Sequence, residues 1–166
     1  MNAEQLMILT LLLPLLGGVG VVATGRFPDL RETVTLITAS AMAVLVLMLA
    51  HRFLDGETFY FSLGEPLPGI AIAFEIEAAG MIFALVAGLL WIVTSIYAIG
   101  YMRGHNEKNQ TRFFAAFAVA ISCAMGIAFS ANLLTLFLFY ELLTLSTYPL
   151  VAHSGTAKAK QGGQVY

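Results

Sequence analysis

The sequence predicts an all-α integral membrane protein, built as a bundle of about five transmembrane helices. Only 11% of its 166 residues are charged and 59% are hydrophobic, whereas a soluble domain carries roughly 25% charged residues. The apolar residues fall into blocks about 20 residues long, which is the length that a helix needs to cross a bilayer. The strands of a membrane barrel are about half as long and alternate in polarity, and these blocks do not alternate.

The first three expected helices are separated by loops that contain charged residues, Pro and Gly. The first helix, residues 6–24, follows a segment that carries Glu4 and no basic residue, so we interpret it as a retained helix and not as a signal peptide. The second helix, residues 33–53, follows a short loop with two Arg and one Pro. A polar, turn-rich stretch precedes the third helix, which we expect at residues 73–100.

The last two expected helices lie close together in the sequence. The fourth, residues 113–130, follows a hydrophilic loop. A two-residue turn, Ala131 and Asn132, leads into the fifth, residues 133–152, and a polar tail follows it. The whole chain is therefore predicted to be a single transmembrane domain, residues 1–166.

The basic residues predict how the bundle is oriented. Seven of the eight Lys and Arg residues lie in the loops at one end, and the eighth, Arg52, lies at the other end beside three acidic residues. The positive-inside rule then places the N-terminus outside and the C-terminal tail in the cytoplasm. We expect a multi-pass protein of the cell (inner) membrane. The seven are Arg26, Arg31, Arg103, Lys108, Arg112, Lys158 and Lys160.

Two expected helices carry small residues at four-residue spacing, which places those residues on one face. In lipid, such faces let helix backbones approach closely, and van der Waals contact then holds the helices together. We interpret both stripes as packing surfaces of a bundle, and we expect the fourth helix to be enclosed by protein along its stripe. The stripes are Gly80, Ala84 and Gly88 in the third helix, and Ala116, Ala120, Ala124 and Ala128 in the fourth.

Glu141 is the candidate functional residue. It lies near the middle of the fifth expected helix and therefore near the bilayer midplane. An acidic residue there costs about 2.5–3.5 kcal/mol, so we expect protein, not lipid, to surround it. Thr144 and Tyr148 follow at three and seven residues and share its face, which suggests a proton path.

Two interpretations of this carboxyl remain open. Burial raises the pKa of a carboxyl and a nearby Lys lowers it, so a carboxyl whose partner moves is a switchable proton site. Alternatively, Glu141 is a structural residue that is hydrogen-bonded to a neighbouring helix. None of the five expected helices places a Lys, Arg or His at the midplane, so the sequence names no partner.

The remaining candidates are weaker, and no catalytic centre is expected. Glu75 and Glu77 lie at the outer end of the third expected helix, where water can reach them. His153, at the inner end of the fifth, is a further possible member of the proton path. Cys123 is the single cysteine and offers neither a disulfide nor a metal site. No phosphate-binding loop or zinc motif is present, so we expect no cofactor and no metal. The net charge of −2 argues against a nucleic-acid partner.

Four segments of the chain are similar to one protein family: Asn132–Val151, which contains the Phe-Tyr-Glu141-Leu-Leu-Thr run, Phe74–Met81, Ser95–Arg103 and Arg112–Phe117. They resemble the proton-pumping antiporter-like family, most closely the D-type large subunits of Mrp-type cation/proton antiporters. This family also includes the antiporter-like membrane subunits of respiratory complex I. The resemblance implies that Glu141 pairs with a lysine on a later helix, and that their changing separation moves protons.

The resemblance implies a protein that works with other membrane subunits. Family members have about fourteen helices, so this chain is similar to their N-terminal third, and Gln164–Tyr166 looks like the start of a sixth helix. The leading function is proton-coupled transport of Na⁺ or another monovalent cation. The alternatives are a proton-pumping subunit of an NADH-quinone oxidoreductase or hydrogenase complex, with the redox chemistry in a partner, and a non-transporting structural fragment.

Overall fold

The computed structural model describes residues 2–153 and 161–162 and contains five long helices and one β-hairpin. All five helices are long and apolar enough to cross a membrane. In chain order the elements are α1 (Ala3–Ala23), α2 (Pro28–Leu54), β1 (Tyr60–Leu67), β2 (Ile70–Glu75), α3 (Ala78–Gly104), α4 (Gln110–Ala128) and α5 (Leu133–Val151). The predicted all-α membrane bundle with five spans is thus confirmed, with the hairpin as an addition.

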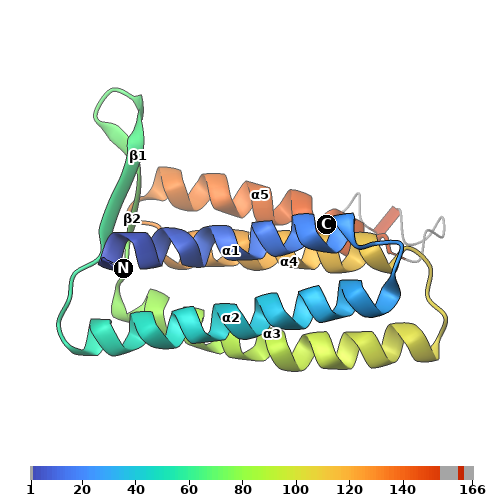
Figure 1. Ribbon diagram of the computed structural model, residues 1–166. Coiled ribbons are helices and arrows are strands. Elements are labelled where there is room, and N and C mark those ends of the chain that lie inside the picture. The colour runs from blue at the N-terminus through green and yellow to red at the C-terminus, as the bar shows by residue number, and fades with distance from the viewer. Residues whose placement is uncertain (1, 154–160, 163–166) are drawn as a thin grey trace.

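The helices run side by side, with α5 on the outside of the other four (Figure 1). Helix α1 packs against α2 and α4, α3 packs against α2 and α4, and the four therefore form a closed ring. Helix α5 packs against α4 and against the hairpin strand β2. Helix α4 is consequently the element that joins the fifth helix to the ring.

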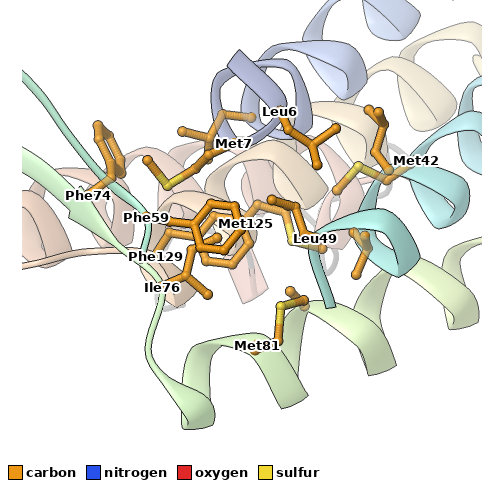
Figure 2. Packing of buried hydrophobic residues seen from close by; sticks show 14 of the residues in the cluster. Leu6, Met7, Met42, Leu49, Phe59, Phe74, Ile76, Met81, Met125 and Phe129 are labelled. Carbon is orange, nitrogen blue, oxygen red and sulfur yellow. The ribbon is translucent and has the colours of Figure 1, made fainter. Parts of the chain in front are cut away.

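The core of the ring is apolar and lies nearest the end that carries the hairpin (Figure 2). The largest fully buried side chains include Trp91, Phe59, Phe74 and Phe129. Methionines fill the spaces between these rings; Met7, Met42 and Met125 have no exposed surface. Such flexible, unbranched side chains adapt to irregular gaps between helices.

Four of the five helices begin at positions that differ from those expected, and α1 begins at Ala3 and not at Leu6. Helix α2 begins at Pro28, not at Thr33, because Pro at the first helical position loses no hydrogen bond and has a preset φ. Arg31, which the sequence places in a loop, therefore lies inside a helix and is buried. Helix α4 likewise begins at Gln110 and not at Phe113.

Helix α3 begins at Ala78 and not at Ala73, because the preceding residues pair as a strand. Strand β2 runs antiparallel to β1, with Tyr60 opposite Glu75 and Phe61 opposite Phe74. Gly64 and Gly69 have positive φ angles, which most other residues avoid, and Gly69 lies in the turn. In place of the expected loop, the turn-rich stretch is thus a hairpin that projects from one end of the bundle (Figure 1).

Glycines of α3 and α4 make close helix contacts, at Gly80 of the predicted small-residue stripe and at Gly126, which lies outside both stripes. A Cβ atom on Gly80 would overlap the backbone of Ala128, and one on Gly126 would overlap the ring of Phe139. Ala84 is completely buried. The expectation of full enclosure is wrong for Ala116, because this residue borders an open groove between α1 and α4.

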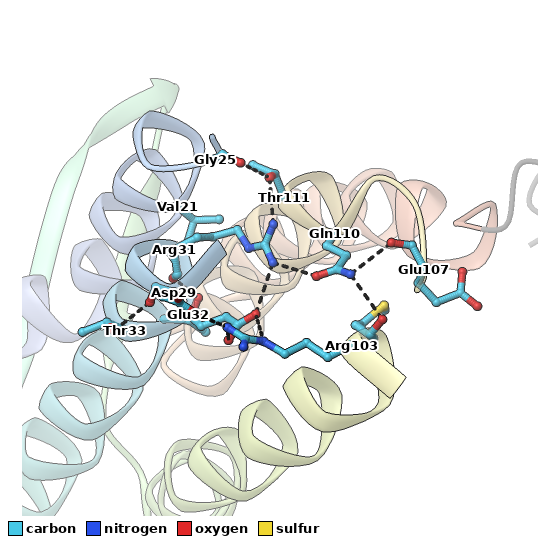
Figure 3. Close-up of polar contacts among 12 residues, drawn as sticks. Val21, Gly25, Asp29, Arg31, Glu32, Thr33, Arg103, Glu107, Gln110 and Thr111 are labelled. Atoms are coloured by element: carbon cyan, nitrogen blue, oxygen red, sulfur yellow. Dashed lines mark hydrogen bonds and ion pairs between the residues drawn. The ribbon is translucent and has the colours of Figure 1, made fainter. Parts of the chain in front are cut away.

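Buried polar groups tie α2, α3 and α4 together at the end opposite the hairpin (Figure 3). Glu32 Oε2 lies 2.6 Å from Arg103 Nη2, and Glu32 Oε1 lies 3.3 Å from Arg31 Nη2. Arg103 also pairs with Asp29. Arg31 donates to Gln110 Oε1 at 2.7 Å and lies over the ring of Phe114. Arg31 and Glu32 are both more than nine-tenths buried, so each charge depends on these partners.

We expect Glu32→Gln to destabilise the protein by about 3 kcal/mol, because removing one partner leaves the buried Arg31 without its counter-charge. The measurement is the free energy of unfolding of the complete protein in detergent. The control is Glu57→Gln, whose half-exposed carboxylate lies 3.5 Å from Arg52 and should contribute about 1 kcal/mol or less. Equal effects of the two substitutions would contradict the role of Glu32 as the counter-charge of the buried Arg31.

We also expect Gly80→Ala to lower the unfolding temperature clearly, since its Cβ would meet backbone atoms of Ala128 that cannot rotate away. Gly100→Ala is the matched control on the same helix, because nothing lies within 4 Å of its added Cβ. That control should be neutral or stabilising by about 0.5–1 kcal/mol. If Gly100→Ala lost as much stability as Gly80→Ala, the overlap with Ala128 would not be the cause of the loss.

Candidate functional site

Helix α5 is fixed at its beginning by the hairpin and by its own cap. The side chain of Asn132 accepts a hydrogen bond from the Thr135 backbone N–H at 2.9 Å and donates to the Ala71 carbonyl at 2.8 Å. The Ala73 N–H donates to Thr135 Oγ1 at 3.0 Å. Strand β2 therefore holds the α4–α5 turn, and with it the position from which α5 enters the membrane.

Further along, α5 approaches α4 closely at Gly126. Phe139 lies against this glycine, and its ring also makes an edge contact with Phe74 of β2 at a centroid distance of 5.4 Å. Among the described residues of α5, Thr135 is the one that is fully buried. The helix thus contacts the bundle along one side and presents its other side to the surroundings.

Glu141 lies on the exposed part of α5. It makes no hydrogen bond or ion pair with any residue that the structure describes. The ring of four helices does not enclose this carboxyl, because α5 lies outside the ring and packs against α4 and the hairpin strand β2 (Figure 1). The expectation that protein and not lipid surrounds Glu141 therefore stays a prediction.

The neighbouring hydroxyl groups are bonded within α5 itself. Thr144 Oγ1 donates to the Tyr140 carbonyl at 3.1 Å, and Thr147 Oγ1 donates to the Thr144 carbonyl at 2.8 Å. Tyr140, Leu143, Thr144 and Thr147 border a hollow of about 310 Å³. Tyr148 is 42% exposed. Because α5 is continuous over this stretch, Glu141, Thr144 and Tyr148 share one face as their spacing predicts.

His153 is separated from that face. It follows the end of α5, twelve residues after Glu141, which corresponds to about 18 Å along a helix axis. Its ring packs edge-on against Phe113, and its Nε2 atom lies 3.9 Å from Glu107 Oε2. Both ring nitrogens are buried without a hydrogen bond to a described residue. The structure therefore brings His153 to the α3–α4 connection and not to the carboxyl of Glu141.

The two other acidic candidates are exposed at the hairpin end. Glu75 is the last residue of β2, and its backbone N–H donates to the Phe129 carbonyl at 2.7 Å. Glu77 precedes α3 without a side-chain capping bond. The hydrogen bonds of these two residues are made by their backbone groups, and both residues are exposed.

The polar cluster around Arg31 and Glu32 is not predicted by the sequence analysis. A signal is present, since Pro followed by an acidic residue, Pro28-Asp29, is typical of a helix start. That start places Glu32 and Arg31 inside the membrane-facing bundle. Within residues 2–153 and 161–162, no three His, Cys, Asp or Glu side chains gather in a way that could hold a metal ion.

The chain is similar to membrane subunits of known protein complexes. It is 30% identical over 124 residues to NADH-quinone oxidoreductase subunit N of Desulforudis audaxviator, covering 72% of this chain and 24% of that one. It is 23% identical over 169 residues to a probable K(+)/H(+) antiporter A/B-type subunit of Rhizobium meliloti, covering 98% of this chain and 16% of that one. Its homologues are membrane subunits of quinone oxidoreductases and of cation/proton antiporters. No family model matches the chain.

The fold is also found in a solved respiratory complex. A chain in the structure of the membrane-bound sulfane sulfur reductase, an archaeal respiratory membrane complex, superposes with a TM-score of 0.76 at 16% identity. The match covers 98% of this chain and 24% of that one. The chain thus spans about a quarter or less of the length of these relatives. Its five long apolar helices and its membrane-subunit homologues show that it is a multi-pass membrane protein.

Proposed function

We propose that this chain is part of a proton-translocating, antiporter-like membrane subunit, and that Glu141 is its proton site. The observation that carries the proposal is the carboxyl in the middle of α5, on a side that the other four helices leave open. A membrane-spanning helix cannot present this group to lipid without a cost of about 2.5–3.5 kcal/mol. A further membrane segment therefore covers this side of α5.

The covering segment would carry a cation. A carboxylate in a site without water is stabilised by a charge partner, and separation from that partner favours uptake of a proton. The resemblance implies a lysine in this role. The hydroxyl groups of Thr144 and Tyr148 then continue the polar face toward the end of the helix, where they offer acceptors and donors to a proton or to water molecules.

The transport could be coupled in two ways, and each has support. Exchange of protons for Na⁺ or another monovalent cation is favoured by the similarity to the Rhizobium antiporter protein. A redox-driven proton pump is favoured by the fold of the archaeal complex and by the similarity to the quinone oxidoreductase protein. In both cases the partners are other membrane subunits, and Glu141 takes up and releases the proton. A purely structural role for the chain is the outcome that the Glu141 variants below test.

Glu141→Gln should preserve the fold and abolish or strongly reduce proton-coupled transport. Gln is almost isosteric and can hydrogen-bond, but it neither ionises nor pairs with a cation by charge. Glu141→Asp should retain partial activity. The assay is proton flux in inverted vesicles that contain the complete assembly, with the amount of assembled protein measured for each variant.

Glu75→Gln and Glu77→Gln are the matched controls, because their carboxylates are exposed at the end of the bundle and should be replaceable. Wild-type flux from Glu141→Gln would leave Glu141 as a structural residue. Equal losses from all three substitutions would show a general effect of removing an acid.

We further infer that the hairpin end faces outward and that the loops around α1–α2 and α3–α4 face the cytoplasm. The basis is the distribution of Lys and Arg. Cysteine introduced at Gly104, where an added side chain meets nothing within 4 Å, should react only with reagents supplied from the cytoplasm. Cysteine at Leu54, which is 84% exposed, should react from outside. The native Cys123 is buried and should contribute little background. The reverse labelling pattern would overturn the orientation.

A further inference from the structure

An apolar groove runs along the surface between α1 and α4. It has a volume of about 820 Å³ and lies next to Ala116, where the small-residue face of α4 is not covered. Its walls are almost entirely apolar, and its one charged residue is Arg112, at the end where α1 finishes and α4 begins. The lining residues include Leu15, Gly18, Val19, Val22, Ala115 and Val119.

The mouth of the groove is positively charged. Arg112 is exposed, and its one hydrogen bond among described residues goes to the His153 carbonyl at 3.3 Å. Arg26 is also exposed and has no hydrogen bond or ion pair with a described residue. It follows Gly25, whose carbonyl accepts a hydrogen bond from Thr111 Oγ1 at 3.4 Å. The two arginines therefore belong to segments that touch at this end.

The start of α4 adds to this preference for an anion. Thr111 and Arg112 lie in its first turn, where backbone N–H groups have no helical partner and the helix dipole favours negative charge. This turn contains no acidic side chain, and no side chain caps it. The nearby Glu107 carboxylate points instead toward His153, 3.9 Å away.

The length of the groove matches one leaflet of a bilayer. From Ala23 to Leu15 it extends over eight residues of α1, or about 12 Å at the helical rise, whereas half of the hydrocarbon core is about 15 Å thick. Beyond Leu15, Phe61 and Leu63 of the hairpin and Phe139 of α5 border a separate, smaller cavity of about 170 Å³. A transmembrane helix would need a surface about twice as long as the open groove.

We propose that this groove is a binding site for an anionic phospholipid of the leaflet that meets the α1–α2 loop. One acyl chain lies between α1 and α4, from the interface to about the midplane. The phosphate group lies at the first turn of α4, within reach of Arg112 and Arg26. The proposal does not depend on the transport function or on the orientation of the bundle.

The test is native mass spectrometry of the complete protein in a mild detergent, with phosphatidylglycerol or zwitterionic phosphatidylcholine added. The wild-type protein should retain phosphatidylglycerol preferentially. Arg26→Gln and Arg112→Gln should each weaken this retention about fivefold, since one basic residue contributes about that much to binding an anionic lipid surface. Arg52→Gln, at the opposite end, is the charge control and should leave retention unchanged.

The second arm tests the acyl-chain position. Val19 is 68% exposed and lines the groove, and Val19→Trp should fill it and reduce retention of both lipids. Val93→Trp is the matched control, because Val93 is 62% exposed on α3 and lies away from the groove. Unfolding temperatures check that all variants fold. Unchanged phosphatidylglycerol retention in both Arg variants and in Val19→Trp would overturn the proposal. It would also be overturned if the wild-type assembly retained no lipid and the Val19→Trp assembly lacked a partner protein that the wild-type assembly contains.

Discussion

The structure depends on the cost of leaving a polar group without a partner in hydrocarbon. Backbone groups meet this requirement within each helix, which is why the membrane-spanning segments are helical. The hairpin projects from one end of the helical part (Figure 1), and its strand β2 hydrogen-bonds with Phe129, Ala131 and Thr135 around the α4–α5 turn. The buried charges of Arg31 and Glu32 meet the same requirement at the opposite end of the bundle, through one another and through Arg103 and Gln110. Glu141 is the exception, and that exception suggests its function.

Helix α4 holds the bundle together by close packing, in addition to the polar contacts of Gln110 at its beginning. It packs against α1, α3 and α5, and close approaches occur at glycines, where Gly80 of α3 meets α4 and Gly126 of α4 meets α5. Lipid tails are as apolar as the side chains that they would replace, so only a tight fit favours helix over lipid. Within the apolar part of the bundle, Ser122 of α4 adds a hydrogen bond to this fit, from its Oγ to the Leu11 carbonyl of α1 at 2.6 Å. The groove beside Ala116 is the place on α4 where the fit is left open.

The number of helices and their type are predictable because bilayer thickness imposes a length that composition alone reveals. Helix starts are less predictable, since Pro28 is typical of a break between helices and serves equally well as the first helical residue. The hairpin is not predicted, because its glycines and prolines are typical of any turn. The pairing of β1 with β2 is visible only in the three-dimensional structure. The polar face of Glu141, Thr144 and Tyr148 follows from helical spacing. The side of α5 that the other helices cover does not follow from the sequence, because the residues of α5 that contact them show no regular spacing.

The way α5 is held bears on how a proton site could work. Asn132 and Thr135 fix the start of the helix to the hairpin strand, and Phe139 locks it against Gly126 before the chain reaches Glu141. After Glu141, Pro149 has no backbone N–H to donate, and Leu145 and Tyr148 are exposed, until Arg112 and Phe113 contact His153 beyond the end of the helix. The carboxyl thus lies between two points at which α4 contacts the chain. A site of this kind keeps its position relative to the bundle, while a partner segment on the open side can approach and withdraw without unfolding anything else. The separation of charge from counter-charge that proton transfer requires then costs a movement between segments and not a rearrangement of the four-helix ring.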